Sequence, residues 1–351
     1  MESNNQQNSG SRGKVLVTGA GGYIGSVLIP ILLSENYLVV AIDRFFFGIN
    51  CLPEHKNLIK IKEDCRKIKE QHFHGIDYVI DLVAISNDPS GEAYRNATIE
   101  INQNSRINTA KLAKNAGVKR YILPSSCSIY GYQDSDVAVS ETAVTNPLTT
   151  YALANEQAEK GVLKLKDDGF VVVVLRQATV YGLSKRMRFD LAINGMTYGA
   201  WKSRKLPLMR SGNQWRPMVH VNDAAKAQLF MLKAPVEKIN GEIFNVGSNK
   251  NNYQIGNLGK KIAKLVGDDV EIEWYGDDDN RSYKVSFDKI EELGFFASLI
   301  ADDGVNEIII ALKNGIIDRD PTTITLEWYK TLTEWHGKIK ELEMYKGIID
   351  I

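Results

Sequence analysis

The chain has 351 residues, of which 44% are hydrophobic and 25% are charged, and its 43 basic residues equal its 43 acidic residues. This length can bury a sizeable core in one large domain or two ordinary ones. The zero net charge argues against nucleic acid or a membrane surface as a partner, because such binders carry an excess of Lys and Arg.

Cysteine usage and hydropathy exclude further classes. The three cysteines form no CxxC pair, which argues against a disulfide framework and a metal site. No apolar run approaches the ~20 residues that a membrane helix needs. Residues 1–13 are polar and lack the apolar core of a signal peptide, so we expect a disordered tail on a cytoplasmic protein.

From residue 14 onward, short apolar runs alternate with helical patterns. The predicted strands lie at residues 15–17, 38–43, 58–62, 78–83, 121–123 and 170–175. One predicted helix follows the first strand and ends near residue 34, and two others run over about 99–116 and 151–167. This alternation predicts an α/β fold with a doubly wound parallel sheet covered by helices on both faces.

The pattern loosens after residue 182. Basic and aromatic residues mix between residues 185 and 216, and short elements follow. We expect a first domain over 14–182 and a smaller α+β domain over 183–351. The apolar runs at Phe230 and at 244–247 are candidates for segments that return to the first domain.

A glycine-rich turn is the sharpest local signal. Gly19, Gly22 and Gly25 follow the first strand and open a helix. Such a turn lets the main chain approach a pyrophosphate, whose charge is then stabilised by the helix N-terminus. Asp43 ends the next strand, where a carboxylate accepts hydrogen bonds from ribose hydroxyls. That acid favours NAD over NADP, although Arg44 beside it weakens the preference.

Several motifs in order resemble the extended short-chain dehydrogenase/reductase family, and in particular its NAD-dependent nucleotide-sugar epimerases and dehydratases. They are the glycine turn, Asp64, the segment 82–84, Asn102, the Ser-Ser-x-x-Ile-Tyr-Gly segment at 125–131, Tyr151, and the segment 216–223. The resemblance covers about residues 14–320. It implies a Rossmann NAD-binding domain at 14–182, a substrate-binding domain mainly within 183–351, and a homodimer.

The resemblance also assigns residues to the site. The implied NAD contacts are Gly19, Gly22, Tyr23, Ile24, Gly25, Asp43, Arg44, Asp64, Cys65, Leu82, Val83, Ala84, Asn102, Tyr151 and Asn155. The implied contacts with a nucleotide-diphosphate sugar are Ser126, Thr179, Arg188, Arg216 and Arg281. Arginine suits a diphosphate because its guanidinium forms bidentate charge-assisted hydrogen bonds.

The implied chemistry is reversible oxidation at a sugar carbon, most often C4. Tyr151 takes the hydroxyl proton as a phenolate, and Ser126 hydrogen-bonds the same oxygen. The resemblance favours epimerisation through a transient 4-keto sugar. Cys127 and Ser128 stand where 4,6-dehydratases carry an Asp-Glu pair, which disfavours dehydration.

One position departs from the family pattern. The family carries a lysine four residues after the tyrosine, whereas this chain has Asn155. The lysine bonds the nicotinamide ribose and lowers the tyrosine pKa. A tyrosine at its reference pKa of about 10 is only ~0.1% ionised at pH 7, a handicap of roughly 4 kcal/mol. Lys160 lies on the opposite side of the helix.

This departure leaves alternatives open. The enzyme is slow, another cation enters from elsewhere in the chain, or catalysis has been lost. Alternative functions are therefore a 4-dehydrogenase that makes a keto sugar and NADH, and a non-catalytic protein that binds NAD or a sugar nucleotide. We expect Asn155→Lys to raise turnover or to shift its pH optimum downward.

Overall fold

The computed structural model describes residues 11–133, 137–277 and 281–342. Most of the predicted disordered tail lies outside these residues. The main feature is a sheet of seven strands in the order β11-β7-β5-β4-β1-β2-β3, in which every pair is parallel. Its strands are β1 (Lys14–Thr18), β2 (Leu38–Asp43), β3 (Leu58–Lys62), β4 (Tyr78–Asp81), β5 (Arg120–Ser126), β7 (Val171–Gln177) and β11 (Glu242–Val246). The predicted doubly wound parallel sheet is confirmed.

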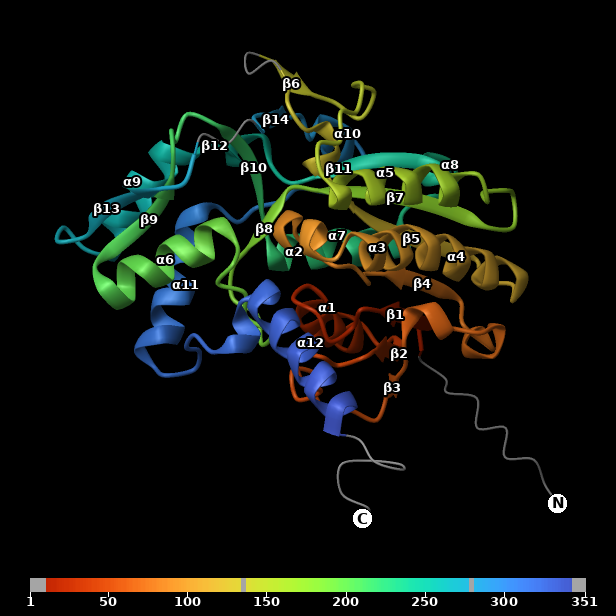
Figure 1. Ribbon diagram of the computed structural model, residues 1–351. Coiled ribbons are helices and arrows are strands. Elements are labelled where there is room, and N and C mark those ends of the chain that lie inside the picture. The colour runs from red at the N-terminus through yellow and green to blue at the C-terminus, as the bar shows by residue number, and fades with distance from the viewer. Residues whose placement is uncertain (1–10, 134–136, 278–280, 343–351) are drawn as a thin grey trace.

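Helices cover both faces of this sheet (Figure 1). They are α1 (Gly25–Ser34), α4 (Arg106–Asn115), α5 (Thr150–Leu163) and α7 (Val221–Lys233). Alternate residues of β1 enter different cores, with Val15 and Val17 packing on the α1 side and Leu16 on the α4 side. Because both faces are buried, the inner strands β1, β2, β4 and β7 are mainly apolar, whereas the edge strand β3 is partly exposed and contains two lysines.

Several element boundaries differ from the sequence expectation, and two of these differences have a clear physical reason. The strand expected over 78–83 ends at Asp81, since the main chain of the next two residues passes against Gly19, where an added Cβ would lie 2.7 Å from Leu82 C. The helix expected over 151–167 ends at Leu163. Asp167 instead caps a turn, in which its Oδ1 accepts from the main-chain N–H groups of Gly169 and Phe170 at 2.9 and 2.8 Å.

The helix expected over 99–116 is composite. A π-helix, η3 (Ile99–Ser105), continues directly into α4. Two short helices, α2 (Asp88–Ala93) and α3 (Arg95–Thr98), precede it. A π-helix is rare and is often found at functional sites.

The C-terminal region has its own core. The helices α6 (Ala192–Ser203), α9 (Ile255–Val266) and α11 (Ala301–Lys313) surround it. The strands of this region are β8 (Thr179–Tyr181), β9 (Lys205–Met209), β10 (Trp215–His220), β12 (Asn252–Gln254), β13 (Glu271–Tyr275) and β14 (Lys284–Val285). They form a β12-β10-β8 sheet and a β13-β9 pair, while β14 pairs with β6 (Ala138–Val139). The short helix α8 (Val236–Ile239) joins α7 to β11, and α10 (Asp288–Glu292) packs against β11.

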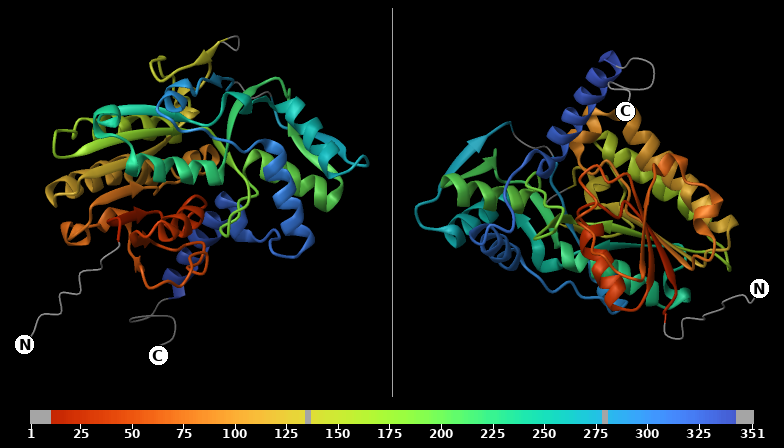
Figure 2. Two further views of the ribbon diagram at one scale, coloured as in Figure 1. Left: turned by 180° about the vertical axis from the view of Figure 1, so that it is seen from behind. Right: turned by 90° about the horizontal axis from the view of Figure 1, so that it is seen from below.

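Segments from beyond residue 182 reach back to the large sheet. Strand β11 pairs with β7, and α7 packs against α1. The last helix, α12 (Thr325–Leu342), lies beside the N-terminal half (Figures 1 and 2). Its Trp328 Nε1 donates to the carbonyl of Phe46 at 2.6 Å. Across the described residues, no helix combines the length and apolarity needed to cross a bilayer.

Candidate active site

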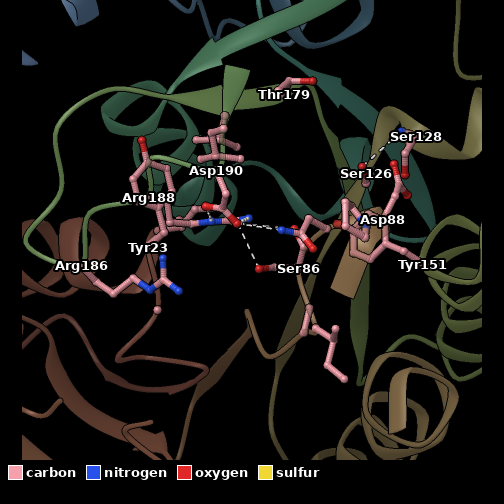
Figure 3. Close-up of a pocket in the computed structure, with 18 of the residues that line it drawn as sticks. Tyr23, Ser86, Asp88, Ser126, Ser128, Tyr151, Thr179, Arg186, Arg188 and Asp190 are labelled. Atoms are coloured by element: carbon pink, nitrogen blue, oxygen red, sulfur yellow. Dashed lines mark hydrogen bonds and ion pairs between the residues drawn. The ribbon is translucent and has the colours of Figure 1, made fainter. Parts of the chain in front are cut away.

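A cavity of about 900 Å³ opens at the carboxyl ends of the parallel strands, between the large sheet and the C-terminal region (Figure 3). Ligands bind at this edge in open α/β sheets. The cavity is lined by most of the sequence-predicted site residues, namely Gly19, Gly22, Tyr23, Ile24, Gly25, Asp43, Arg44, Asp64, Cys65, Leu82, Val83, Ala84, Ser126, Tyr151, Thr179, Arg188, Arg216 and Arg281. The fold therefore brings together residues from nearly the whole chain.

The glycine turn has no room for side chains. Gly19 has a φ of +63°, a conformation that favours glycine. A Cβ at Gly25 would lie 2.3 Å from the carbonyl oxygen of Ala20, so the N-terminus of α1 sits directly on the turn. This arrangement places the N-terminus of α1 at the cavity, where it fits the diphosphate of a dinucleotide.

Two carboxylates stand at the ends of β2 and β3. Asp43 accepts from the main-chain N–H groups of Gly21 at 3.0 Å and Phe45 at 2.6 Å, while burial raises its pKa. Asp64 accepts two side-chain hydrogen bonds from Arg66, at 2.9 and 2.6 Å. These bonds lower the pKa of Asp64 to about 2. Arg44 turns to Asp64 at 3.2 Å, so Asp43 is left to face the cavity as an acceptor.

Tyr151 occupies the second position of α5 and lines the cavity. Thr149 caps this helix by accepting from the Ala152 N–H at 3.1 Å. Gly91 of α2 packs so closely that an added Cβ would lie 3.0 Å from Tyr151 Cβ. Ser126 ends β5, and its Oγ accepts from the Ser128 N–H at 3.1 Å (Figure 3). Local capping and close packing thus hold the two hydroxyl-bearing residues at one place.

Several groups act on the Tyr151 hydroxyl. Burial raises the pKa of Tyr151, and the hydrogen bond with Ser126 lowers it. The Asp88 carboxylate raises this pKa further, whereas the charges of Arg106 and Arg188 lower it. The net shift is upward, so the phenol needs positive charge nearby to ionise near neutral pH.

Two predicted cofactor contacts are not among the residues that line the cavity. Asn102 clamps the loop after β4, with Oδ1 accepting from Ile85 N–H at 2.8 Å and Nδ2 donating to its carbonyl at 3.0 Å. Asn155 is 1% exposed and donates to the Tyr151 carbonyl at 2.9 Å. Its Oδ1 accepts from Arg106 at 3.0 Å. The roles of both asparagines toward NAD remain predictions.

Two arginines enter the cavity from the loop after β8. Arg188 forms a bidentate pair with Asp190, both bonds being 2.9 Å, and also donates to Ser86 Oγ at 3.0 Å (Figure 3). Arg186 lies 3.7 Å from the ring centroid of Phe47 and donates to Thr325 Oγ1 at 3.1 Å. Burial and the neighbouring Arg188 charge lower the pKa of Arg186 to about 10. Two buried guanidiniums at one cavity wall suit an anionic ligand.

The other predicted substrate residues come from more distant segments. Arg281 forms an ion pair with Asp88 at the cavity wall. Arg216 donates to the main-chain carbonyls of Trp215 at 2.8 Å and of Arg281. Thr179 lies at the start of β8 and lines the same wall.

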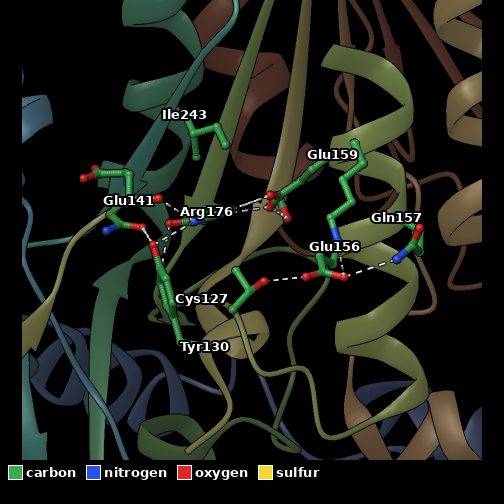
Figure 4. Close-up of polar contacts among 12 residues, drawn as sticks. Cys127, Tyr130, Glu141, Glu156, Gln157, Glu159, Arg176 and Ile243 are labelled. Atoms are coloured by element: carbon green, nitrogen blue, oxygen red, sulfur yellow. Dashed lines mark hydrogen bonds and ion pairs between the residues drawn. The ribbon is translucent and has the colours of Figure 1, made fainter. Parts of the chain in front are cut away.

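A second polar network lies beneath the cavity and is structural (Figure 4). Arg176 of β7 pairs with Glu159 of α5 at 2.8 Å, and both side chains are buried. Tyr130 accepts from Arg176 at 3.0 Å. Cys127 is buried, and this burial raises the pKa of its thiol. A protonated, enclosed thiol packs as a small apolar residue.

Sequence reasoning missed two charged residues that act on Tyr151, Asp88 and Arg106. Asp88 is the first residue of α2, directly after the loop that follows β4, and it lines the cavity. Arg106 shares the buried face of η3 and α4 with Asn102, Thr109 and Ala113. Its helical spacing with these residues was a readable signal, because a charged residue is seldom placed on a buried face.

Comparison with known proteins identifies the family. Residues 15–247 match the model of the NAD dependent epimerase/dehydratase family. A putative UDP-glucose 4-epimerase of Methanocaldococcus jannaschii is 26% identical over 86% of this chain and 99% of its own length. A UDP-glucuronate 4-epimerase of Thermodesulfobacterium geofontis is 26% identical over 75% of this chain and 83% of its own length.

Solved structures have the same fold. The UDP-glucuronic acid 4-epimerase of Bacillus cereus, in complex with UDP-glucuronic acid and NAD, aligns with a TM-score of 0.78 and 24% identity. That alignment covers 86% of this chain and 99% of the other. The UDP-glucose 4-epimerase of Thermotoga maritima aligns with the same TM-score at 21% identity, over 87% of this chain and all of the other.

The family match agrees with the glycine turn and the acid at the end of β2. Within the described residues, no cluster of three or more His, Cys, Asp or Glu side chains is arranged to hold a metal ion. The chain belongs to the NAD-dependent epimerase/dehydratase family, and NAD is its cofactor.

Proposed function

We propose that this protein is a nucleotide-sugar epimerase that works through a transient 4-keto sugar, with Tyr151 as the base. The observation that carries the proposal is the shared cavity. It joins the glycine turn, the hydroxyls of Tyr151 and Ser126, and arginines from three separate segments. A cofactor site, a proton acceptor and an anion site in one enclosure suit redox chemistry on a phosphorylated sugar.

The chain's own residues divide the work. The Gly19–Gly25 turn would hold the NAD diphosphate and Asp43 the adenosine ribose. NAD, when bound, supplies reversible hydride acceptance. The Tyr151 phenolate accepts the proton of the sugar hydroxyl as that carbon is oxidised and returns it when the carbonyl is reduced. Ser126 donates a hydrogen bond to the same oxygen and stabilises its developing charge.

The arginines support a diphosphate as the anchoring group of the substrate. Arg188, Arg216 and Arg281 line the wall of the cavity that is formed by the C-terminal region. Both curated relatives described above have names that specify UDP-sugars. A diphosphate held at a distance from the sugar leaves the ring free to present either face of its carbonyl, as epimerisation requires.

One observation favours a second candidate, a protein that binds NAD or a sugar nucleotide without turnover. Burial raises the pKa of Tyr151, and the residue one helical turn later is the neutral Asn155. A phenol that stays protonated at neutral pH cannot act as a base.

The test is to incubate the protein with NAD and a panel of nucleotide sugars, following NADH absorbance and product identity together. An isomer without net NADH supports the epimerase, whereas accumulating NADH with a keto sugar identifies a dehydrogenase. Tyr151→Phe is the matched variant, because it removes only the hydroxyl. We expect its turnover to fall by roughly 10²–10⁴-fold while NAD affinity is retained. NAD binding without any turnover across the panel would favour the binding protein.

We also propose a homodimer through the helices η3, α4 and α5. Ile99 of η3 is 39% exposed and Leu153 of α5 is 47% exposed, although large apolar side chains are normally buried. These helices pack against each other on one face of the sheet. Light scattering should give twice the chain mass, and Leu153→Lys should reduce it. A monomeric wild type contradicts this proposal.

A further inference from the structure

A buried cation lies beside Asn155. Arg106 is 1% exposed, and its Nη1 donates to Asn155 Oδ1 at 3.0 Å. Asn155 in turn donates from Nδ2 to the carbonyl of Tyr151 at 2.9 Å. A short chain of hydrogen bonds therefore links the guanidinium of Arg106 to the helical turn that carries the tyrosine.

The rest of the Arg106 side chain is fixed by the ends of two strands. Its Nη2 donates to the carbonyl of Asp81 at 2.9 Å and to the carbonyl of Pro124. Asp81 ends β4, and Pro124 precedes Ser126 at the end of β5. The guanidinium thus also ties the segment carrying Ser126 to the segment carrying the cofactor loop.

The Asp81 carboxylate balances the charge of Arg106 but forms no hydrogen bond with it. The Asp81 carboxylate approaches only Nε, at 3.9 Å, which is beyond hydrogen-bonding distance. That carboxylate accepts instead from the hydroxyls of Thr18 and Tyr121. The two terminal amino groups of Arg106 face neutral oxygens. The guanidinium therefore lies between the Asp81 carboxylate on its Nε side and the helical turn of Asn155 and Tyr151 on its Nη1 side.

We infer that Arg106 is a positioning residue that supplies, through Asn155, the positive charge that supports Tyr151 as a base. The inference rests on the proposed function, since it concerns the base of that reaction. Arg106 belongs to α4, which packs against α5, the helix that carries Tyr151. Asn155 is the spacer, because a neutral amide can accept from Arg106, whereas a lysine ammonium would face it with like charge.

Other charges act on the same phenol. Asp88 raises the pKa of Tyr151, and Arg106 and Arg188 both lower it. Arg188 already forms a bidentate pair with Asp190, which reduces its influence. Of these two arginines, Arg106 donates directly to a side chain of the helix that carries Tyr151, that of Asn155.

The test is the ionisation of Tyr151, measured without turnover. Phenolate absorbance is titrated in the NAD-bound protein, and the curve of the matched Tyr151→Phe variant is subtracted. In Arg106→Met we expect the Tyr151 pKa to rise by about one unit or more, because an opposite charge at short range shifts a pKa by roughly 1–3 units. Turnover at neutral pH should fall about 10-fold per unit. Arg106→Lys should retain most of the shift.

Arg120→Met is the control for loss of a buried arginine. Arg120 lies at the other end of β5 and donates to the carbonyl of Met231. It should lose stability and leave the Tyr151 titration unchanged. If Arg106→Met does not fold, Arg106→Gln applies the same test, because its amide can donate to the main-chain carbonyls of Asp81 and Pro124 but carries no charge. That variant should fold and raise the Tyr151 pKa.

The inference is overturned if a folded Arg106→Met, or Arg106→Gln in its place, ionises Tyr151 at the wild-type pH. This outcome differs from a failure of the proposed function. A protein that shows the Arg106-dependent titration but turns over no nucleotide sugar would keep the inference about Arg106 and reject the epimerase.

Discussion

The two halves of the cavity are built from different kinds of group. The half next to β1 and β2 is built around main chain, in a turn where a Cβ at Gly19 or Gly25 would lie within 3 Å of neighbouring main-chain atoms. The half beneath the C-terminal region is charged side chain. There, Arg188 is paired with Asp190 and Arg281 with Asp88 before any ligand binds.

This difference teaches how each half recognises its ligand. A main-chain cradle selects by shape and is insensitive to most side-chain substitutions outside the glycines. Arginines held by carboxylates are preorganised, but an incoming diphosphate must share them with Asp190 and Asp88. Cofactor binding should therefore depend on space, and substrate binding and the stability of this half should depend on charge balance.

The largest expected effect is on the charged half. Arg188→Met leaves Asp190 without its bidentate partner in a site where both side chains are nearly buried. Breaking such a pair by removing one partner costs about 3 kcal/mol of unfolding free energy. Urea denaturation measures this cost.

The double variant Arg188→Met/Asp190→Asn should recover part of the loss, because no unpaired charge remains. Lys338→Met removes a solvent-exposed pair with Glu334 and should cost under about 1 kcal/mol. If Arg188→Met unfolds at the same urea concentration as wild type, the Arg188–Asp190 pair does not stabilise this half of the cavity.

The second largest effect is expected in the main-chain half, from substitution of Gly25. An alanine Cβ there would lie 2.3 Å from the Ala20 carbonyl oxygen, so the turn and the start of α1 must separate. We expect Gly25→Ala to weaken NAD binding by about 100-fold, or roughly 2.7 kcal/mol, measured by calorimetry.

Gly337→Ala is the matched control, because no atom lies within 4 Å of the added Cβ. It should leave the NAD affinity unchanged. Equal NAD affinity in Gly25→Ala and wild type would show that close main-chain packing does not define this half.

The same contrast explains how much of the site could be predicted from the sequence. The cofactor half is local, since the glycine turn, Asp43 and the loop after β4 each follow a strand, and parallel strands bring their carboxyl ends together. The substrate half is not local. The Asp88–Arg281 pair joins positions 193 residues apart, and no periodicity reports such a contact.

Asn155 shows a further limit. The sequence correctly marks the position as lacking its expected charge, but the neighbouring guanidinium arrives from another helix, 49 residues away. The structure also changes the expectation for Asn155→Lys. A lysine there would face Arg106 in a site that excludes solvent, so we expect the single variant to lose stability. Combined with Arg106→Met, it relocates one charge and should restore both stability and a lowered Tyr151 pKa.

The smallest expected effect is on the pH dependence of stability and comes from Asp64. This carboxylate lies on the cofactor side of the cavity and pairs with Arg66. Arg66 lowers the pKa of Asp64 from 3.8 to about 2. Because the folded-state pKa lies below the unfolded value, the ionised carboxylate stabilises the fold above about pH 4, and this stabilisation is lost as the pH falls toward 2. Since Arg66 is partly exposed, solvent screening reduces the contribution to about 1 kcal/mol.

In Asp64→Asn the unfolding free energy should fall less steeply over that pH range than in wild type. Arg66→Met should reduce the pH dependence of the unfolding free energy in the same way. Parallel profiles for all three proteins would mean that charge pairing adds nothing on this side, and the division between a main-chain half and a charged half would become sharper.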